Sequence, residues 1–210
     1  GTLAAIIGPN GAGKTTLINL LTGLLTPDTG TVQFKGEDIT RVPSHGRVRR
    51  GLSRSFQIMN IFPNLTVRQN LLLPALARRR RNLHAVARLE DETGANAEAE
   101  ELLREIGLWN HRDVRAGALS HGDQRLLELG IAVGTRPELC FLDEPCAGMN
   151  PIERQTVLGL MRKLSGQRRT TFVIVEHDMD VVFSLAERII VMTHGEVLAD
   201  GTPAEIRENR

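Results

Sequence analysis

The stretch Gly8–Thr16, which reads GPNGAGKTT, constrains what this chain can fold into more than any other. It follows a short apolar run at residues 3–7 and leads into residues 17–21, whose composition favours a helix. A strand, a glycine-rich turn and a helix in this order are the setting in which the pattern G-x-x-x-x-G-K-S/T indicates a phosphate-binding loop. The predicted nucleotide-binding residues of this loop are Gly8, Pro9, Asn10, Gly11, Ala12, Gly13, Lys14, Thr15 and Thr16.

The chemistry of the loop follows from its residue types. The glycines let the backbone curl so that successive N–H groups point at the β- and γ-phosphates, and the following helix adds its positive N-terminal dipole. Lys14 is placed to reach the β/γ oxygens, and the Thr15 hydroxyl can be a ligand of the Mg²⁺ that bridges them. A glycine-rich turn that binds nothing would not need this lysine and two threonines. The sequence therefore predicts a protein that binds a nucleoside triphosphate.

Composition sets the class of protein. The chain has 210 residues, 41% hydrophobic and 24% charged, which is ordinary for a soluble globular protein of one or two domains. A net charge of +1 and an aromatic content of 3% give no reason to expect a nucleic-acid partner. The sequence has no apolar run of the ~20 residues that a membrane span needs and no signal-peptide pattern. Cys140 and Cys146 are expected to be small buried hydrophobes rather than a disulfide.

The order of apolar patterns predicts an α/β fold. Short continuous apolar runs indicate parallel strands buried on both faces, at residues 139–142, 172–175 and 189–192. Shorter strands are expected at 31–34 and 53–57. Residues 66–81 read as a helix that Pro74 kinks, and residues 84–117 read as charged and helical, with a break at 94–96. We therefore expect a helix-rich insertion at about 66–135 within an α/β protein.

Two acids follow the predicted strand 139–142 directly. The carboxyl ends of parallel strands form the edge of a sheet where ligands bind, so Asp143 and Glu144 are expected at that edge. Asp143 suits the outer coordination sphere of Mg²⁺, and Glu144 suits the polarisation of an attacking water. The alternative is a solvated acidic turn, which the phosphate-binding loop makes the weaker interpretation.

Two further polar residues also end predicted strands. His177 follows the strand 172–175 and could hydrogen-bond the γ-phosphate and hold the water in line. Gln57 ends the strand 53–57, where its amide could contact Mg²⁺ and the water and report the γ-phosphate to the helical insertion. A surface glutamine is the alternative for Gln57.

The segment Leu119–Arg125 decides between classes of phosphate-binding-loop proteins. A small hydroxyl at Ser120 and a glycine at Gly122 near a helix start form a second anion site. Because the loop that contains Lys14 is already the first anion site, this second site must bind a different triphosphate. A head-to-tail dimer meets that need, with Ser120 and Gly122 contacting the γ-phosphate held by the partner's Lys14. An ordinary helix cap is the alternative.

Together these motifs resemble the ATP-binding subunit of an ABC transporter, over essentially all of the chain. Gly8–Thr16 is similar to the family's Walker A motif, and Gln57 to its Q-loop. Leu119–Gln124 resembles the signature motif, Leu139–Glu144 the Walker B motif, and His177 the switch histidine.

Within this family, the chain looks like the subunits that import branched-chain (hydrophobic) amino acids. The segments that carry this resemblance are residues 56–57, 62–67, 147–151 and 176–179. Urea/amide importers and a lipopolysaccharide-export ATPase are near relatives. The chain departs from the common pattern with His121, Asp123 and Asn150, where glycine, glutamine and aspartate are usual. These forms suit the amino-acid importer branch.

The resemblance implies a P-loop NTPase (RecA-like) core at about 1–65 and 136–210 and a helical subdomain at about 66–135. It implies ATP and Mg²⁺ as cofactors, with Glu144, His177 and Gln57 catalytic and Ser120, Gly122 and Asp123 contacting nucleotide. Thr15, Gln57 and Asp143 would hold the metal. An adenine-stacking aromatic is expected upstream of the loop, and we expect it to lie with N-terminal strands before Gly1.

The implied partners are a second ATP-binding subunit, identical or not, and membrane permease subunits, with a periplasmic or extracellular binding protein acting indirectly. Residues 58–66 would pass motion to the permease at the cytoplasmic face of the inner membrane. The run 78–81 of arginines is either a solvated helix end or a contact with anionic lipid headgroups. A soluble ABC ATPase acting on DNA or ribosomes is the alternative. A small-molecule kinase would leave 119–124 without a purpose.

Overall fold

The fold is seen in a computed structural model, which describes residues 2–55, 61–78, 93–167 and 169–208. The described part of the chain forms a six-stranded sheet in the order β4-β5-β6-β1-β7-β8. Every pairing in it is parallel except that of β7 with β8. Its strands are β1 (Leu3–Ile7), β4 (Leu52–Ser55), β5 (Leu139–Asp143), β6 (Thr171–Val175), β7 (Arg188–Thr193) and β8 (Glu196–Gly201).

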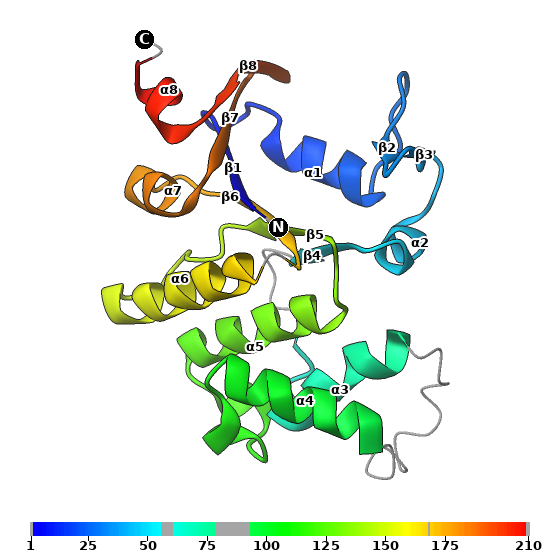
Figure 1. Cartoon of the computed structure of the whole chain (residues 1–210), viewed down its shortest axis with the longest axis vertical. Helices are drawn as coiled ribbons and strands as arrows, with labels where there is room; N and C mark the ends of the chain where they lie inside the picture. The colour runs from blue at the N-terminus through cyan, green and yellow to red at the C-terminus, as the bar shows by residue number, and fades with distance from the viewer. Residues whose placement is uncertain (1, 56–60, 79–92, 168, 209–210) are drawn as a thin grey trace.

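Helices cover both faces of this sheet (Figure 1). In that view α1 (Lys14–Thr22) lies on one side of β1, and α6 (Pro151–Gly166) and α7 (Met179–Leu185) lie on the other. The remaining elements are a small hairpin of β2 (Gln33–Phe34) and β3 (Glu37–Asp38), two 3₁₀ turns at Trp109–His111 and Ala116–Ala118, and the helices α2 (Ser44–Arg49), α3 (Val67–Arg78), α4 (Thr93–Glu105), α5 (His121–Gly134) and α8 (Pro203–Glu208).

Strand periodicity divides the core into two clusters. All of β1 is buried, and its alternate side chains point to opposite faces, as the period of two requires. Leu3 and Ala5 join the cluster that includes α6 and α7, whereas Ile6 packs with Ile18 of α1. The apolar runs predicted at 139–142, 172–175 and 189–192 are confirmed as the neighbouring strands β5, β6 and β7.

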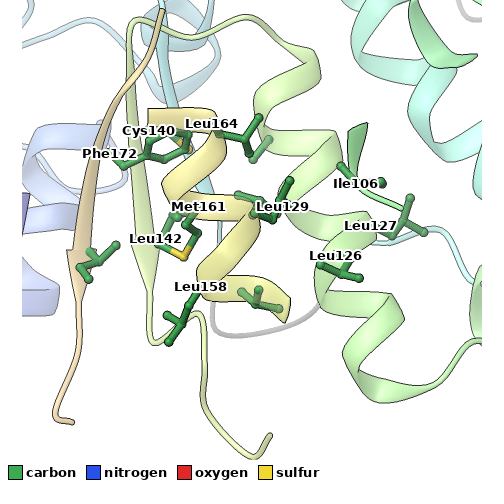
Figure 2. Close-up of a cluster of buried hydrophobic side chains, with 14 of the residues drawn as sticks. Ile106, Leu126, Leu127, Leu129, Cys140, Leu142, Leu158, Met161, Leu164 and Phe172 are labelled. Atoms are coloured by element: carbon green, nitrogen blue, oxygen red, sulfur yellow. The ribbon is translucent and has the colours of Figure 1, made fainter. Parts of the chain in front are cut away.

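The larger cluster continues from the sheet into the helices α3, α4 and α5. Figure 2 shows α6 between the strands and α5, with Met161 beside Leu142 and Leu129 on the opposite side. Ala95, Ala99 and Leu103 of α4 and Leu71 of α3 are fully buried in the same cluster. The boundaries proposed above for a core and a helical subdomain stay a prediction, but one continuous apolar cluster joins both groups of elements.

The prediction of a helix break at residues 94–96 was wrong. The helix α4 begins at Thr93 and runs through Gly94, Ala95 and Asn96. Ala95 recurs with Ala99 and Leu103 on one fully buried face, so tertiary packing outweighs the weak helix propensity of Gly94.

Other element boundaries differ in detail from the prediction. The helix expected at 66–81 is α3, which continues through Pro74. Its last described residue is Arg78, which forms an ion pair with Glu98. Residues 79–81 and 56–57 lie outside the described residues. Of 31–34 only Gln33–Phe34 is a strand. Cys140 and Cys146 are buried thiols, as expected. No helix in the described ranges is long and apolar enough to cross a bilayer.

A fully buried arginine joins α1 to the segment that follows it. Arg47 of α2 is 1% exposed, and its guanidinium donates hydrogen bonds to the carbonyl oxygens of Leu20 (2.6 Å), Leu21 (2.9 Å), Thr40 (2.9 Å) and Val42 (2.8 Å). Two of these acceptors belong to the last turn of α1, whose carbonyls have no partner within the helix. Arg47 thus caps the C-terminal end of α1, the helix whose N-terminal end follows the phosphate-binding loop.

We predict that Arg47→Ala is strongly destabilising. Buried acceptors that lose their donor cost about 1–3 kcal/mol each, so the expected loss is roughly 3–5 kcal/mol of unfolding free energy in urea titration. Arg47→Lys should lose part of this, because an ammonium lacks the planar fork. The control Arg49→Ala removes an exposed arginine of the same helix and should change stability by less than about 0.5 kcal/mol. Equal midpoints for the two alanine variants would contradict the capping role.

Candidate functional site

The phosphate-binding loop occupies the turn between β1 and α1. Gly8 has φ 151°, and a Cβ atom built there would lie 2.1 Å from the backbone oxygen of Met192 in β7. Only glycine fits this position, because the neighbouring contact is backbone and cannot move aside. Lys14 is 7% exposed, and its Nζ donates to the carbonyl oxygens of Gly8 (2.8 Å) and Pro9 (3.0 Å). The ammonium therefore lies within the curl of the loop.

One cavity brings three of the predicted motifs together. Its volume is about 330 Å³, and its described lining consists of Asn10, Gly11, Ala12, Gly13, Lys14, Thr15, Thr16, Asp143, Glu144, Val175 and His177. These residues end or follow β1, β5 and β6, which are adjacent parallel strands, so their carboxyl ends meet at one edge of the sheet. The sequence-predicted loop, acids and histidine share this site.

Asp143 is the last residue of β5 and is held by an arginine that the sequence analysis missed. Its Oδ2 lies 3.2 Å from Nη2 of Arg54, and the two side chains are 2% and 8% exposed. Arg54 comes from β4 and also donates to the side chain of Asn19 on α1. A buried pair of this kind fixes the aspartate beside the loop. The signal was an arginine near the start of the strand predicted at 53–57, and its partner is 89 residues away.

Glu144 and His177 contact each other at the mouth of the cavity. Oε1 of Glu144 lies 3.0 Å from Nε2 of His177, and the side chains are 31% and 46% exposed. Glu144 has φ 48°, a region that costs a non-glycine residue of order 1–3 kcal/mol. Its backbone N–H donates to the carbonyl of Val175 at 2.9 Å. An ionised carboxylate only accepts, so this contact requires the proton of neutral His177 to be on Nε2.

The predicted second anion site lies at the start of α5. Ser120 is the N-cap of α5: its Oγ accepts from the N–H of Asp123 (3.1 Å) and donates to the Asp123 carboxylate (2.9 Å). Gly122 sits so close to Glu153 of α6 that an added Cβ would lie 2.8 Å from its Cγ. The described lining of the 330 Å³ cavity contains none of Ser120, Gly122 and Asp123. The structure therefore does not bring this segment to the phosphate-binding loop of the same chain.

Local structure explains the asparagine at position 150. It is the N-cap of α6, where its Oδ1 accepts from the N–H groups of Ile152 and Glu153, both at 3.0 Å. The Glu153 carboxylate accepts in return from the N–H of Asn150 at 3.2 Å, which completes a capping box.

Gln57 lies outside the described residues. Residues 61–66, which are described, are held by Asn70 of α3. Asn70 is fully buried; its Oδ1 accepts from the N–H of Phe62 (2.8 Å), and its Nδ2 donates to the carbonyls of Phe62 (3.1 Å) and Thr66 (2.9 Å). Phe62 itself is 55% exposed. One asparagine thus fixes a loop that presents an aromatic ring to solvent.

Comparison with known proteins identifies the family that uses this geometry. A profile described as ABC transporter matches residues 1–147. This chain belongs to the ABC transporter family.

Proteins of known assignment are similar over almost the whole chain. The high-affinity branched-chain amino acid transport ATP-binding protein BraF of Pseudomonas aeruginosa is 39% identical over 99% of this chain and 83% of its own length. The protein LivG of Escherichia coli, which carries the same description, is 38% identical with the same coverage.

Solved structures of ABC cassettes share the fold. The ADP conformation of MJ1267, an ATP-binding cassette of an ABC transporter, has a TM-score of 0.85 and 33% identity, covering 99% of this chain and 83% of the other. A nucleotide-free ATP-binding cassette has a TM-score of 0.84 and 32% identity with the same coverage. The expected fold class is confirmed, and the ABC cassette described here is an ATP-binding ATPase.

We predict that Gly8→Ala weakens ATP binding by about tenfold or more, a loss of about 1.4 kcal/mol. The added methyl group collides with a backbone carbonyl of β7, so the loop must move away from its phosphate-binding curl. Gly36→Ala is the control: it has φ 80° and open space around it, so it introduces only left-handed strain, in the turn between β2 and β3. The measurement is titration of ATP with Mg²⁺. Wild-type affinity for Gly8→Ala would contradict the fit described here.

Proposed function

We propose that this ABC cassette powers the import of branched-chain or other hydrophobic amino acids, with Glu144 as its catalytic carboxylate. The observation that carries the catalytic part is the 3.0 Å contact between Glu144 and His177 at the rim of the cavity lined by the phosphate-binding loop. The choice of cargo rests on the relatives described as branched-chain amino acid transport proteins, at 38–39% identity.

The cavity suits ATP with Mg²⁺. Backbone N–H groups of the loop and the start of α1 would bind the phosphates, with Lys14 turning from its loop carbonyls to the β/γ oxygens. Thr15 and Asp143 line the same cavity and offer hydroxyl and carboxylate oxygens, which suit a Mg²⁺ held by few protein ligands and by phosphates. Gln57 is proposed as a further contact. The ion would neutralise charge on the β- and γ-phosphates during transfer.

Hydrolysis would use the two residues at the rim. The Glu144 carboxylate orients a water and accepts its proton as the water oxygen bonds to the γ-phosphorus. The bond from that phosphorus to the β–γ bridging oxygen breaks, and ADP leaves with its electron pair. His177 contacts Glu144 through its Nε2–H, and with ATP bound this same N–H would donate a hydrogen bond to the γ-phosphate. Arg54 keeps Asp143 oriented.

We further propose a head-to-tail dimer of ATP-binding subunits. Ser120, Gly122 and Asp123 would complete the partner's site; their absence from the described lining of their own cavity and the exposed position of Ser120 at the start of α5 support this arrangement. Permease subunits would dock near residues 58–66, where Asn70 holds the exposed Phe62. The cassette would thus be peripheral at the cytoplasmic face of the inner membrane, and a binding protein would act through the permease.

We predict that Glu144→Gln binds ATP but loses turnover. The amide keeps shape and hydrogen bonding but is no base, and loss of a general base costs about 10²–10⁴ in rate. The variant should also accumulate as an ATP-bound dimer on a sizing column. ATPase assays with Glu196→Gln, an exposed glutamate in β8, provide the matched control.

The same pair of variants tests the cargo in cells. Uptake of labelled leucine should fall with Glu144→Gln and persist with Glu196→Gln, while uptake of an unrelated solute is unchanged. Wild-type hydrolysis by Glu144→Gln would contradict the catalytic role of Glu144. Unaffected uptake of leucine, isoleucine and valine would contradict the proposed cargo.

The trans arrangement predicts recovery in a mixture of two inactive proteins. Ser120→Arg and Lys14→Ala protomers should each be inactive alone. A mixed dimer has one composite site with both defects and one with neither, so part of the ATPase activity should return. A mixture that forms mixed dimers, shown by differential tags, but recovers no activity would contradict the head-to-tail model.

A further inference from the structure

A buried glutamate lies directly before His177. Glu176 follows β6 and is 6% exposed. Its carboxylate accepts a hydrogen bond from the backbone N–H of Cys146 at 3.1 Å. Burial raises the pKa of the neighbouring Cys146 thiol to about 12, so that thiol stays protonated beside the carboxylate. One carboxylate therefore joins the segment after β5 to the segment after β6.

The position is costly for the fold. Burial raises the pKa of Glu176, and the carboxylates of Glu144 and Asp178 raise it further, against the N–H bonds that lower it. Arg154, whose charge acts on the Cys146 thiol, forms an ion pair with Asp178. A buried carboxylate without a cationic partner is tolerated only where hydrogen bonds hold it. The carboxylate of Glu176 is long enough to accept a hydrogen bond from the segment that follows the neighbouring strand β5.

The length of the Glu176 side chain matters because Glu144 lies between two points at which its segment is hydrogen-bonded to residues 175 and 176. The β5–β6 ladder ends one residue before Glu144, whose own N–H donates to Val175 at 2.9 Å. Beyond Glu144, the chain is attached at Cys146 to the segment that follows β6, through Glu176. Glu144 has a positive φ, which an L residue rarely adopts, so both flanking attachments are needed to keep its side chain beside His177.

We propose that Glu176 is a positioning residue for ATP hydrolysis, whose carboxylate holds Cys146 so that Glu144 stays against His177. This inference rests on the proposed roles of Glu144 and His177. Glu176 is not among the residues that line the cavity described above; it acts through the turn that carries Glu144. The acceptor oxygen and its reach matter, and the negative charge does not.

The test compares three substitutions of Glu176 by kcat and KM for ATP with Mg²⁺. Glu176→Ala removes the acceptor, and a misplacement of about 1 Å costs up to about 10²-fold, so kcat should fall 10- to 100-fold while KM changes less than about twofold. Glu176→Gln keeps the oxygen at the same reach and should retain kcat within about threefold. Glu176→Asp keeps the charge but is one CH₂ shorter, and should fall with alanine. Asp180→Ala, an exposed acid of α7, is the control.

The order of the variants decides the outcome. Glutamine above aspartate supports the proposal; aspartate above glutamine, or wild-type kcat for alanine, overturns it. If Glu176→Ala does not fold, the glutamine and aspartate pair decides alone, because both keep a polar acceptor and differ from each other in length and charge. Glu144→Gln runs in parallel: its inactivity beside a fully active Glu176→Ala contradicts this inference alone, whereas a fully active Glu144→Gln contradicts the proposed function.

Discussion

The parallel pairing of β6 with both β1 and β5 is the constraint on which the site depends. Because all three strands run in the same direction, the phosphate-binding loop, the acids at 143–144 and His177 emerge at one edge of the sheet. The apolar runs that form these strands are buried on both faces, so their register is fixed by packing. A shift of one residue in β6 would exchange the faces of its side chains and separate Glu144 from His177.

The sequence predicted the parts whose signal is local. The strands β5, β6 and β7 are continuous apolar runs, and the loop after β1 has a pattern tied to its chemistry. The start of α4 was predicted wrongly, because Gly94 weakens a helix locally whereas the burial of Ala95 and Leu103 depends on α3 and α5. Packing between distant elements cannot be read from the residues near Gly94.

The residues that support the site were hidden for a related reason. Arg54 and Glu176 are separated from Asp143 and Cys146 by 89 and 30 residues, and each is interpretable only when the strand order is known. Arg47 binds backbone carbonyls, which every residue has, so no sequence pattern marks its partners. The placement of Glu144 and His177 was expected, but their direct contact and the positive φ of Glu144 depend on atomic geometry.

The helix α6 has a mechanical consequence. It begins at the Asn150 cap, four peptide bonds after Cys146, and its 16 residues span roughly 24 Å. One flank packs on the strands and the other on α5, with Met161 fully buried between them (Figure 2). A rod that is close-packed along both flanks cannot bend locally, so a small tilt at its cap is delivered along its whole length. Through Glu153 and Gly122, that tilt also reaches the first turn of α5. The packing of α6 thus connects the segment that follows Glu144 to α5.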